Sequence, residues 1–453
     1  MAREGKKNRV NVLVKSTLSA SLPVKPGKTY PLATLDHAMA HHSLHLVFYY
    51  PAAAVAAAGM GREPLRVSLS EVLVHYPAVG GRLTRPAEAG GNWVVRCNDA
   101  GMRVLDAQVR GTMEDWWRTA TPEEEKELAQ WETTGEDVFL WSPFTVQISE
   151  FECGGLAIGL SCAHMYADPM CVTLLVKAWG DAHRRACIVH PPFFHSPALR
   201  ARPTPNLATA SVELLRRKAS SAAAPAAMST ATFRFSDQSV RRCLAQLRPS
   251  CPDAAPFVAL AALFWWRLKG SATASGGPQS LTLCRDIRKL LDAPLPHGFF
   301  GNALHFSAVT ADLADGGWGG AAEAIRAHLD GVEEEEVWST IDWVESRRDP
   351  ATETHGEAFQ MYGPELTCAC LDNLFSYSAA FGAEATAPSH VAYHVGAAEG
   401  EGLILVLPAP PEQEGTLGRT VTVSLPQDQM DKIRHDPVIL DLGPTVLLNS
   451  PSA

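Results

Sequence analysis

The sequence predicts a mixed α/β fold of two domains, each a β-sheet backed by helices. Its 453 residues exceed the usual size of a single domain, about 100–200 residues. Hydrophobic residues make up 46% and charged residues 19%, which is the composition of a globular protein. Strand-like and helix-like stretches alternate on both sides of a region with a weaker pattern. The sequence therefore predicts one domain over residues 1–205, a linker over 206–232 and a second domain over 233–453.

The first half carries both kinds of periodicity. Apolar residues at helical spacing predict a helix over residues 68–76, and residues 36–46 also have a helical pattern. Thr121 followed by Pro122 and two glutamates predicts another helix start, because the hydroxyl can cap the first turn. Short runs of β-branched and apolar residues predict strands over residues 93–97, 102–105, 144–150 and 156–161.

The second half follows a stretch of small residues and proline at 219–227, the best candidate for a linker. Apolar spacing then predicts a helix over residues 239–247 and a buried helix over 257–269. The glycine-rich residues 316–320 lack the lysine of a phosphate-binding loop, so we expect a flexible loop there. Strands are predicted over residues 233–235, 280–284, 305–309, 403–407 and 420–425.

Charge and cysteine content exclude several classes of protein. With 39 Lys and Arg against 49 Asp and Glu, the net charge is −10, which argues against a nucleic-acid partner. The most apolar run, residues 257–266, is shorter than the roughly 20 residues of a transmembrane helix, and the N-terminus gives no secretory signal. Ten cysteines without a C-x-x-C pair indicate a reducing compartment. We expect a monomer in the cytoplasm, without a transmembrane segment.

The most informative motif is H-x-x-x-D, formed by His164 and Asp168 at the end of the strand predicted over 156–161. A residue at a strand end can reach a cleft while the sheet holds its backbone. Imidazole titrates near neutrality, so His164 could remove a proton from a hydroxyl or amine that attacks a carbonyl. Asp168 could orient the histidine or pair elsewhere and stabilise the turn. Taken alone, the motif is also compatible with a buried structural histidine.

Two competing sites use the same segment. Residues 159–163 (GLSCA) approximate a G-x-S-x-G nucleophile elbow around Ser161, which would need Asp372 and His390 or His394 as partners. Cys162 is also a conceivable nucleophile, although no electropositive surroundings mark it. Both interpretations rank below a histidine base.

A histidine-rich stretch offers a possible metal site. His37, His41 and His45 would form one stripe on the helix over residues 36–46, with Asp36 as an acidic neighbour. Spacing alone is weak evidence, and a half-buried helical face explains the pattern as well. We therefore expect no metal site.

Further motifs occur in the order of a known family, and on these the chain resembles the BAHD acyltransferases. These plant enzymes move an acyl group from coenzyme A thioesters to alcohols or amines. The matching residues are 32–36 (LATLD), 65–73 (LRVSLSEVL), 76–77 (YP), 81–83 (GRL), 97–101 (CNDAG), 286–288 (DIR), 294–296 (PLP) and 300–302 (FGN).

The resemblance implies the two-domain fold of CoA-dependent acyltransferases, with a channel between the domains. It implies acyl-CoA as donor substrate, no bound cofactor, His164 as the general base and Asp168 as a structural residue. One motif departs from the family: D-F-G-W-G aligns with residues 380–384 (AFGAE). The family's aspartate at that place pairs with an arginine that corresponds to Arg288, so Arg288 is expected to need another partner.

An intact H-x-x-x-D with an altered second motif is similar to the Eceriferum/Glossy branch of the family, which acts in cuticular wax synthesis. Residues 142–143, 147–148, 151–156, 362–363 and 366–367 also resemble that branch. The resemblance implies support of very-long-chain fatty acid elongation at the endoplasmic reticulum, beside a condensing enzyme. The alternative is a conventional acyltransferase that acts on a soluble alcohol or amine, and a scaffold that uses neither His164 nor Asp168 is a third possibility.

Overall fold

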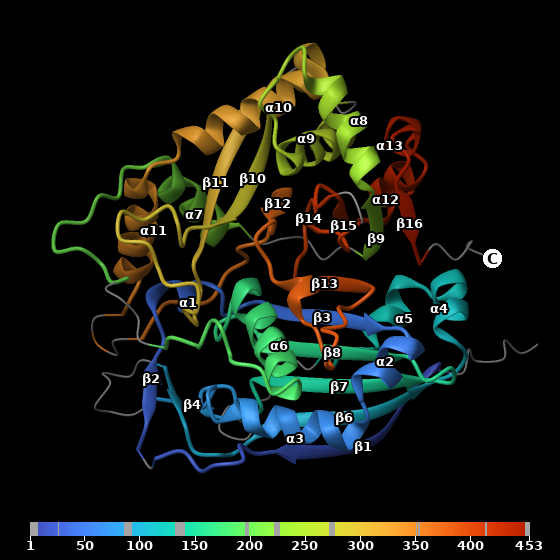
Figure 1. Ribbon diagram of the computed structural model, residues 1–453. Helices are drawn as coiled ribbons and strands as arrows, with labels where there is room; N and C mark the ends of the chain where they lie inside the picture. The colour runs from blue at the N-terminus through green and yellow to red at the C-terminus, as the bar shows by residue number, and fades with distance from the viewer. Residues whose placement is uncertain are drawn as a thin grey trace, which may run out of the picture.

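Two β-sheets with helices on their faces form the framework of the protein (Figure 1). The computed structural model describes residues 8–25, 27–85, 93–131, 141–194, 199–221, 227–270, 277–349, 351, 354–412 and 415–448. The predicted mixed α/β class with two sheet-plus-helix units is confirmed.

The first sheet has, within the described residues, six strands in the order β1-β6-β7-β8-β3-β13. Helices α3 (Arg62–Leu73) and α6 (Pro169–His183) cover the front face in Figure 1, and α4 (Met113–Thr119) and α5 (Pro122–Lys126) lie at the other side. Each face has its own buried apolar cluster. The strands are β1 (Val10–Leu18), β3 (Ser43–Tyr50), β6 (Met102–Val109), β7 (Phe144–Phe151), β8 (Leu156–Ala163) and β13 (His390–Gly396).

Strand β13 comes from the second half of the chain but pairs with β3 of the first half. Ser43 lies opposite both Gly396 on β13 and Ala163 on β8. Segments that are more than 200 residues apart in sequence, such as Ala163 and Gly396, therefore meet at one end of this sheet. His164 follows directly at that end.

The second sheet has seven strands in the described chain, ordered β11-β10-β12-β14-β15-β9-β16. Helix α9 (Pro256–Lys269) is apolar on nearly all sides and is buried against the sheet, as the sequence predicts for residues 257–269. The strands are β9 (Met228–Phe235), β10 (Gln279–Asp286), β11 (Leu304–Ala311), β12 (Thr367–Cys370), β14 (Leu403–Pro408), β15 (Arg419–Pro426) and β16 (Thr445–Leu447). The other helices of this cluster are α8 (Asp237–Leu247), α10 (Leu313–Gly331), α12 (Gln427–Arg434) and α13 (Pro437–Asp441).

The segment predicted as a linker, residues 206–232, contains helix α7 (Ala210–Ser220). This helix packs on α11 (Glu334–Ser346) and β11. The Lys218 ammonium is fully buried and donates to the carbonyl of Gly363 (2.6 Å) and to the carboxylate of Glu365 (3.0 Å). Residues 222–226, which follow α7 and belong to the stretch of small residues at 219–227, lie outside the described residues.

Two predicted elements are wrong. Residues 36–46 do not form one helix: α1 (Thr34–Ala38) ends early and β3 begins at Ser43. The aromatic and β-branched residues of β3 favour a strand, with side chains alternating between the two faces. Residues 316–320 lie within α10 instead of a loop, although Gly317 has non-helical backbone angles (φ 55°, ψ −150°).

Smaller elements complete the structure. A three-stranded sheet has the order β2-β5-β4 and packs beside the first large sheet. Its strands in the described part of the chain are β2 (Thr29–Pro31), β4 (Arg82–Thr84) and β5 (Val94–Arg96). The described residues also form helix α2 (Ala52–Ala58) and the short 3₁₀ helix η3 (Ser376–Ser378).

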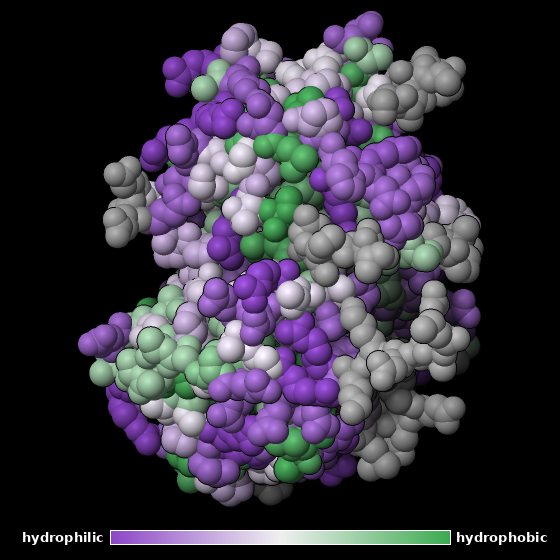
Figure 2. All heavy atoms as spheres, turned by 90° about the vertical axis from the view of Figure 1, so that its right-hand side faces the viewer, coloured by the Kyte–Doolittle hydropathy of each residue, from purple (hydrophilic) through white to green (hydrophobic). Residues whose placement is uncertain are grey.

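The described helices are all too short or too polar to span a lipid bilayer. The face seen in Figure 2 is mainly hydrophilic, with hydrophobic residues in separate groups.

Candidate active site

The H-x-x-x-D motif forms the turn between β8 and α6. Asp168 is the N-cap of α6: its Oδ1 accepts a hydrogen bond from the backbone N–H of Cys171 at 3.0 Å. Pro169 follows as the first helical residue, where its fixed φ angle favours a helix start. The turn therefore places His164 just beyond the strand end, with both His164 and Asp168 fully buried.

Asp168 binds the second half of the chain. Its Oδ2 lies 2.8 Å from Nη1 of Arg288 and accepts the backbone N–H of Ala303 at 3.1 Å. Burial alone would raise the pKa of the Asp168 carboxyl, but Arg288 and the N–H of Cys171 hold it below its ordinary value. These contacts occupy both carboxylate oxygens, so Asp168 stabilises the turn.

The His164 imidazole faces a tyrosine. Its Nε2 lies 3.0 Å from the phenolic oxygen of Tyr362, in the loop before β12. The backbone N–H of His164 donates to the carbonyl of His42 at 3.0 Å. Burial lowers the pKa of His164 to about 4, so the imidazole is neutral at neutral pH.

Two residues, one from the FGN motif and one from the LATLD motif, hold the backbone carbonyl of His164. The Asn302 amide donates to the carbonyl of His164 at 2.8 Å and to Oδ1 of Asp36 at 2.8 Å. The backbone N–H of Asn302 donates to the same Asp36 oxygen at 2.7 Å. Burial raises the pKa of Asp36 to about 6. Asp36 therefore holds Asn302, which in turn holds the carbonyl of His164; the motifs LATLD and FGN, which contain these two residues, do not by themselves predict this arrangement.

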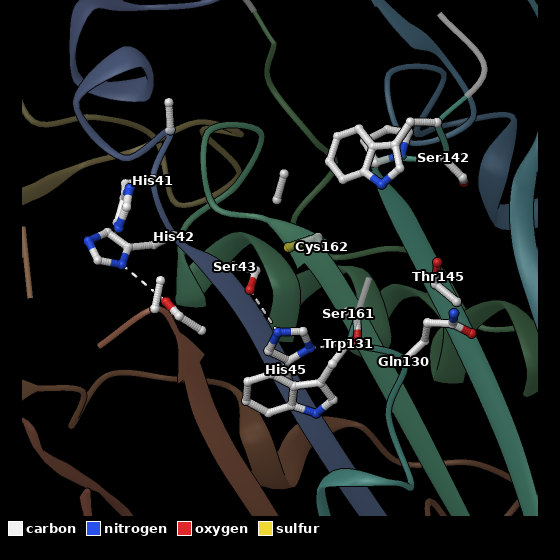
Figure 3. Close-up of a pocket in the computed structure, with 16 residues that line it drawn as sticks. His41, His42, Ser43, His45, Gln130, Trp131, Ser142, Thr145, Ser161 and Cys162 are labelled. Atoms are coloured by element: carbon white, nitrogen blue, oxygen red, sulfur yellow. Dashed lines mark hydrogen bonds between the residues drawn. The ribbon is translucent and has the colours of Figure 1, made fainter. Parts of the chain in front are cut away.

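A cavity of about 250 Å³ lies at the same end of the first sheet (Figure 3). We call it the His45 cavity; its walls include Ser43, His45, Trp131, Ser161 and Ala163. Nδ1 of His45 lies 2.9 Å from Oγ of Ser161, and Nε2 lies 2.8 Å from Oγ of Ser43. The Trp131 ring stacks on the His45 ring with centroids 3.7 Å apart, as Figure 3 shows.

A second cavity, of about 340 Å³, also borders the His164 turn. Met165 and His37 contribute to its wall, together with His355, whose ring stacks on that of His37 at 3.9 Å. Ala40 lines both cavities. The side chain of His164 lines neither of these two cavities; the residues on either side of it, Ala163 and Met165, do.

The structure does not assemble a nucleophile elbow at Ser161. This residue lies within strand β8, opposite Thr145 and His45, instead of on a strand-to-helix turn. The residues predicted as its partners pair elsewhere: Asp372 with Arg419, His390 with Arg234, and His394 with Glu125. Burial raises the pKa of the Cys162 thiol well above its ordinary value, so it is not an activated thiolate.

The histidine stripe is also not formed. His37 lies on α1 and His45 lies on β3, so His37, His41 and His45 do not share one helical face. In the described part of the chain, no group of three or more His, Cys, Asp or Glu side chains is placed to hold a metal ion.

Arg288 has partners despite the altered second motif. Its guanidinium lies 2.8 Å from Asp168 and 2.6 Å from Asp286, so it does not depend on the aspartate missing at Ala380. The 380–384 segment packs instead against α6, where the buried ring of Phe381 contacts Trp179.

Gly382 in that segment should tolerate no side chain. Its φ is +73°, and a Cβ would collide with Cα of Ala58 on α2. We expect Gly382→Ala to lower the free energy of unfolding by about 2–4 kcal/mol, measured by urea denaturation. Gly320→Ala on α10 is the matched control, because its Cβ would meet no atom within 4 Å, and it should change stability by less than about 1 kcal/mol. Equal stability of the two variants would contradict this packing.

Comparison with known proteins identifies the family. A family model described as the Transferase family matches residues 8–440. The chain belongs to this family. These are the BAHD acyltransferases, which use acyl-CoA as donor and need no cofactor, so the resemblance seen in the sequence motifs is confirmed at family level.

Individual relatives are distant. The chain is 28% identical over 423 residues to a hydroxycinnamoyl-CoA:5-hydroxyanthranilate N-hydroxycinnamoyltransferase of Avena sativa, covering 87% of this chain and 91% of the relative. It is 27% identical to the Arabidopsis thaliana protein Eceriferum 26-like, covering 93% of each chain.

Solved structures confirm the fold. The crystal structure of vinorine synthase matches with a TM-score of 0.71 at 18% identity, over 93% of this chain and 96% of that one. F. sporotrichioides TRI101, complexed with coenzyme A and T-2, matches with a TM-score of 0.72 at 14% identity, over 92% and 99%.

Proposed function

We propose that this protein transfers an acyl group from acyl-CoA to an alcohol, with His164 as the general base. The observation that carries the proposal is the neutral His164 imidazole, whose Nε2 already has a hydroxyl oxygen, that of Tyr362, at 3.0 Å. A base must lie within about 2.6–3.2 Å of the hydroxyl that it deprotonates. An acceptor hydroxyl that takes the place of the phenol would meet this requirement.

The steps follow from that position. Nε2 of His164 removes the proton of the acceptor hydroxyl as its oxygen attacks the thioester carbonyl. The tetrahedral intermediate then collapses, the C–S bond breaks and the ester is released. The departing coenzyme A thiolate takes the proton back from the imidazolium. Because the site is buried, the charged imidazolium is costly, and the imidazole is neutral again at the end of each turnover.

Asp168, Arg288, Asn302 and Asp36 act as positioning residues in this proposal. Their hydrogen bonds fix the backbone on both sides of His164 and connect the two halves of the chain. A general base contributes most when its geometry is set before the substrate binds. Tyr362 has to turn aside to admit the acceptor.

The rate should depend little on pH in the mildly acidic range. Because burial lowers the pKa of His164 to about 4, the base stays neutral and active when the pH falls from 8 to 5.5. For an exposed histidine, with a pKa near 6.5, the neutral and active fraction would fall about tenfold between pH 8 and pH 5.5. The measurement is kcat/KM against pH, with tryptophan fluorescence to verify the fold at each point. A decline centred near pH 6.5 would contradict a buried base.

The proposed reaction is tested by a matrix of donors and acceptors. Purified protein is mixed with p-coumaroyl-CoA or palmitoyl-CoA and with aromatic or aliphatic alcohols, and release of free coenzyme A is followed with a thiol reagent. Acceptor-dependent release would support the proposal. Absence of release with every pair, from protein that is folded by circular dichroism, would overturn it.

Support of wax synthesis is the second candidate function. The Eceriferum 26-like relative, which aligns over 93% of each chain, favours it. A relative named omega-hydroxypalmitate O-feruloyl transferase, 26% identical over 311 residues, also acts on a lipid-like substrate by its name. In this role a monomer would act in the cytoplasm or peripherally at the endoplasmic reticulum, beside a fatty-acid elongase condensing enzyme, to extend very-long-chain acyl groups.

Co-expression with a condensing enzyme separates the two functions. In an accessory protein, the His164→Ala variant still shifts the acyl-chain length distribution as the unmodified protein does. In a transferase, the same variant loses ester formation. If the unmodified protein left the acyl-chain length distribution unchanged, the accessory function would be excluded.

A further inference from the structure

The phenol of Tyr362 occupies the position that a nucleophile takes beside a general base. Its oxygen lies 3.0 Å from Nε2 of His164, and both side chains are buried. The Tyr362 ring packs edge-to-face on the rings of His42 and Phe306, with centroids 5.1 and 5.3 Å apart. A hydroxyl within about 2.6–3.2 Å of a base is a structural sign of an activated nucleophile. The arrangement therefore gives the protein a nucleophile of its own.

The loop that carries Tyr362 is held on both sides of this residue. Before it, Nε2 of His42 accepts the backbone N–H of Met361 at 2.9 Å. After it, the carbonyl of Gly363 accepts a hydrogen bond from the Lys218 ammonium at 2.6 Å. Lys218 is fully buried, so this charged hydrogen bond is shielded from water and strong. These two contacts keep the phenol beside the base when no acceptor is bound.

The protonation states of the pair allow a proton to pass from the phenol to the imidazole. Burial lowers the pKa of His164 to about 4 and raises the pKa of Tyr362 well above its ordinary value, so both groups are neutral. A neutral imidazole has one nitrogen without a proton, and a neutral phenol keeps its O–H. With the imidazole proton on Nδ1, the phenol donates to Nε2. The base and the proton that it removes are then already in contact.

We propose that the protein acylates itself on Tyr362 when acyl-CoA is bound and no acceptor is present. The proposal rests on the proposed function for the delivery of the thioester to His164. During transfer the thioester carbonyl must lie within reach of an oxygen that is hydrogen-bonded to Nε2. In the protein without acceptor, that oxygen belongs to Tyr362. The product is an O-acyl-tyrosine at the active site.

The acylation step needs no reactant besides acyl-CoA. The Tyr362 oxygen attacks the thioester carbonyl carbon while its proton passes to Nε2 of His164. The tetrahedral intermediate then collapses and the C–S bond breaks. The coenzyme A thiolate takes the proton from the imidazolium and leaves as the free thiol. Because the proton moves as the C–O bond forms, the step requires no free phenolate, which burial would disfavour.

Mass spectrometry of the intact full-length protein tests the proposal. The protein is incubated with an excess of p-coumaroyl-CoA or palmitoyl-CoA, without alcohol or amine, and the reaction is stopped with acid. We expect the mass of the chain to increase by a single acyl group, and fragment spectra to place that group on Tyr362. An acyl group found only on the exposed thiols of Cys153 or Cys187 would indicate non-enzymatic thioester exchange and would overturn the proposal.

Variants show whether the phenol and the base are both required. Tyr362→Phe keeps the buried ring but removes the nucleophile, so no adduct should form. His164→Gln should slow formation of the adduct at least about 100-fold, because the base is lost. Tyr393→Phe is the matched control: Tyr393 is equally buried, and its hydroxyl has no hydrogen-bond partner in the described part of the chain. This variant should form the adduct as the unmodified protein does.

Hydrolysis of the tyrosine ester is measured in the same reactions. If water removes the acyl group rapidly, the adduct does not accumulate and coenzyme A is released continuously without acceptor. Tyr362→Phe should then stop this release. If no adduct forms, and coenzyme A release without acceptor is absent or is equal in Tyr362→Phe and the unmodified protein, the proposal is overturned.

The two proposals can fail separately. An adduct on Tyr362 without ester formation from any alcohol would overturn the transferase function and leave self-acylation intact. The opposite result is ester formation from an alcohol by a protein that, without acceptor, shows neither the adduct nor coenzyme A release that depends on Tyr362. That result would support the transferase function and overturn self-acylation.

Discussion

Replacement of His164 by alanine is expected to lower the rate of acyl transfer by about 10²–10⁴-fold, the usual contribution of a general base. The loss should be in kcat, because the imidazole acts on the hydroxyl proton during attack. Steady-state assays of coenzyme A release measure the effect, and circular dichroism verifies the fold.

Two further variants make this result specific. His164→Gln keeps a polar group near the Tyr362 hydroxyl but cannot act as a base, so it should be as inactive as the alanine variant. His305→Gln removes another buried histidine, on β11, whose Nε2 contacts the hydroxyl of Ser211, and this variant should retain activity. A rate within threefold of normal for folded His164→Ala would contradict the role of the imidazole and favour the accessory function.

Asp168→Asn should mainly destabilise the protein. The amide can still accept the N–H of Cys171, but it cannot balance the charge of Arg288, which is itself 3% exposed. Breaking a buried ion pair on one side costs up to about 3–5 kcal/mol, and this is an upper bound here because Asp286 still pairs with Arg288. We expect a loss of up to this size in urea unfolding, with a lower melting temperature and reduced activity.

The control is an exposed carboxylate. Asp330 pairs with Arg326 on the surface of α10, where its side chain is 68% exposed, and Asp330→Asn should cost less than about 1 kcal/mol. If Asp168→Asn cost no more than the control but still abolished activity, Asp168 would act on catalysis directly and not through stability.

The fold was largely predictable because its signals are local. Apolar periodicity indicates α9 and the strands β7 and β8, and Thr121 with Pro122 marks the start of α5 with a complete capping box. The helix predicted over 36–46 was wrong because α1 ends at Ala38 and the residues from Ser43 onward pair with β8 and β13 as strand β3, a long-range contact. The helix α7 was missed because the small residues after it dominated the composition of the segment.

The site was predicted only in part, since its contacts are long-range. His164 and Asp168 are four residues apart and appear as a motif. Tyr362 is 198 residues from His164 in sequence, and spacing patterns carry no information about such a pair. The same holds for β13, which joins the first sheet from the second half and brings Gly396 to the cavity. The sequence predicted that Arg288 needs another partner but could not name Asp168 and Asp286, because the prediction was based on the family motif and not on the geometry around Asp168.

The most direct measurement is the ratio of ester formed to coenzyme A released, determined by mass spectrometry with purified protein, acyl-CoA and a neutral alcohol. We expect a one-to-one ratio with the unmodified protein, and ester formation that is at least about 100-fold slower in His164→Gln. Ester formation at equal rates in both proteins, or coenzyme A release without ester, would contradict it.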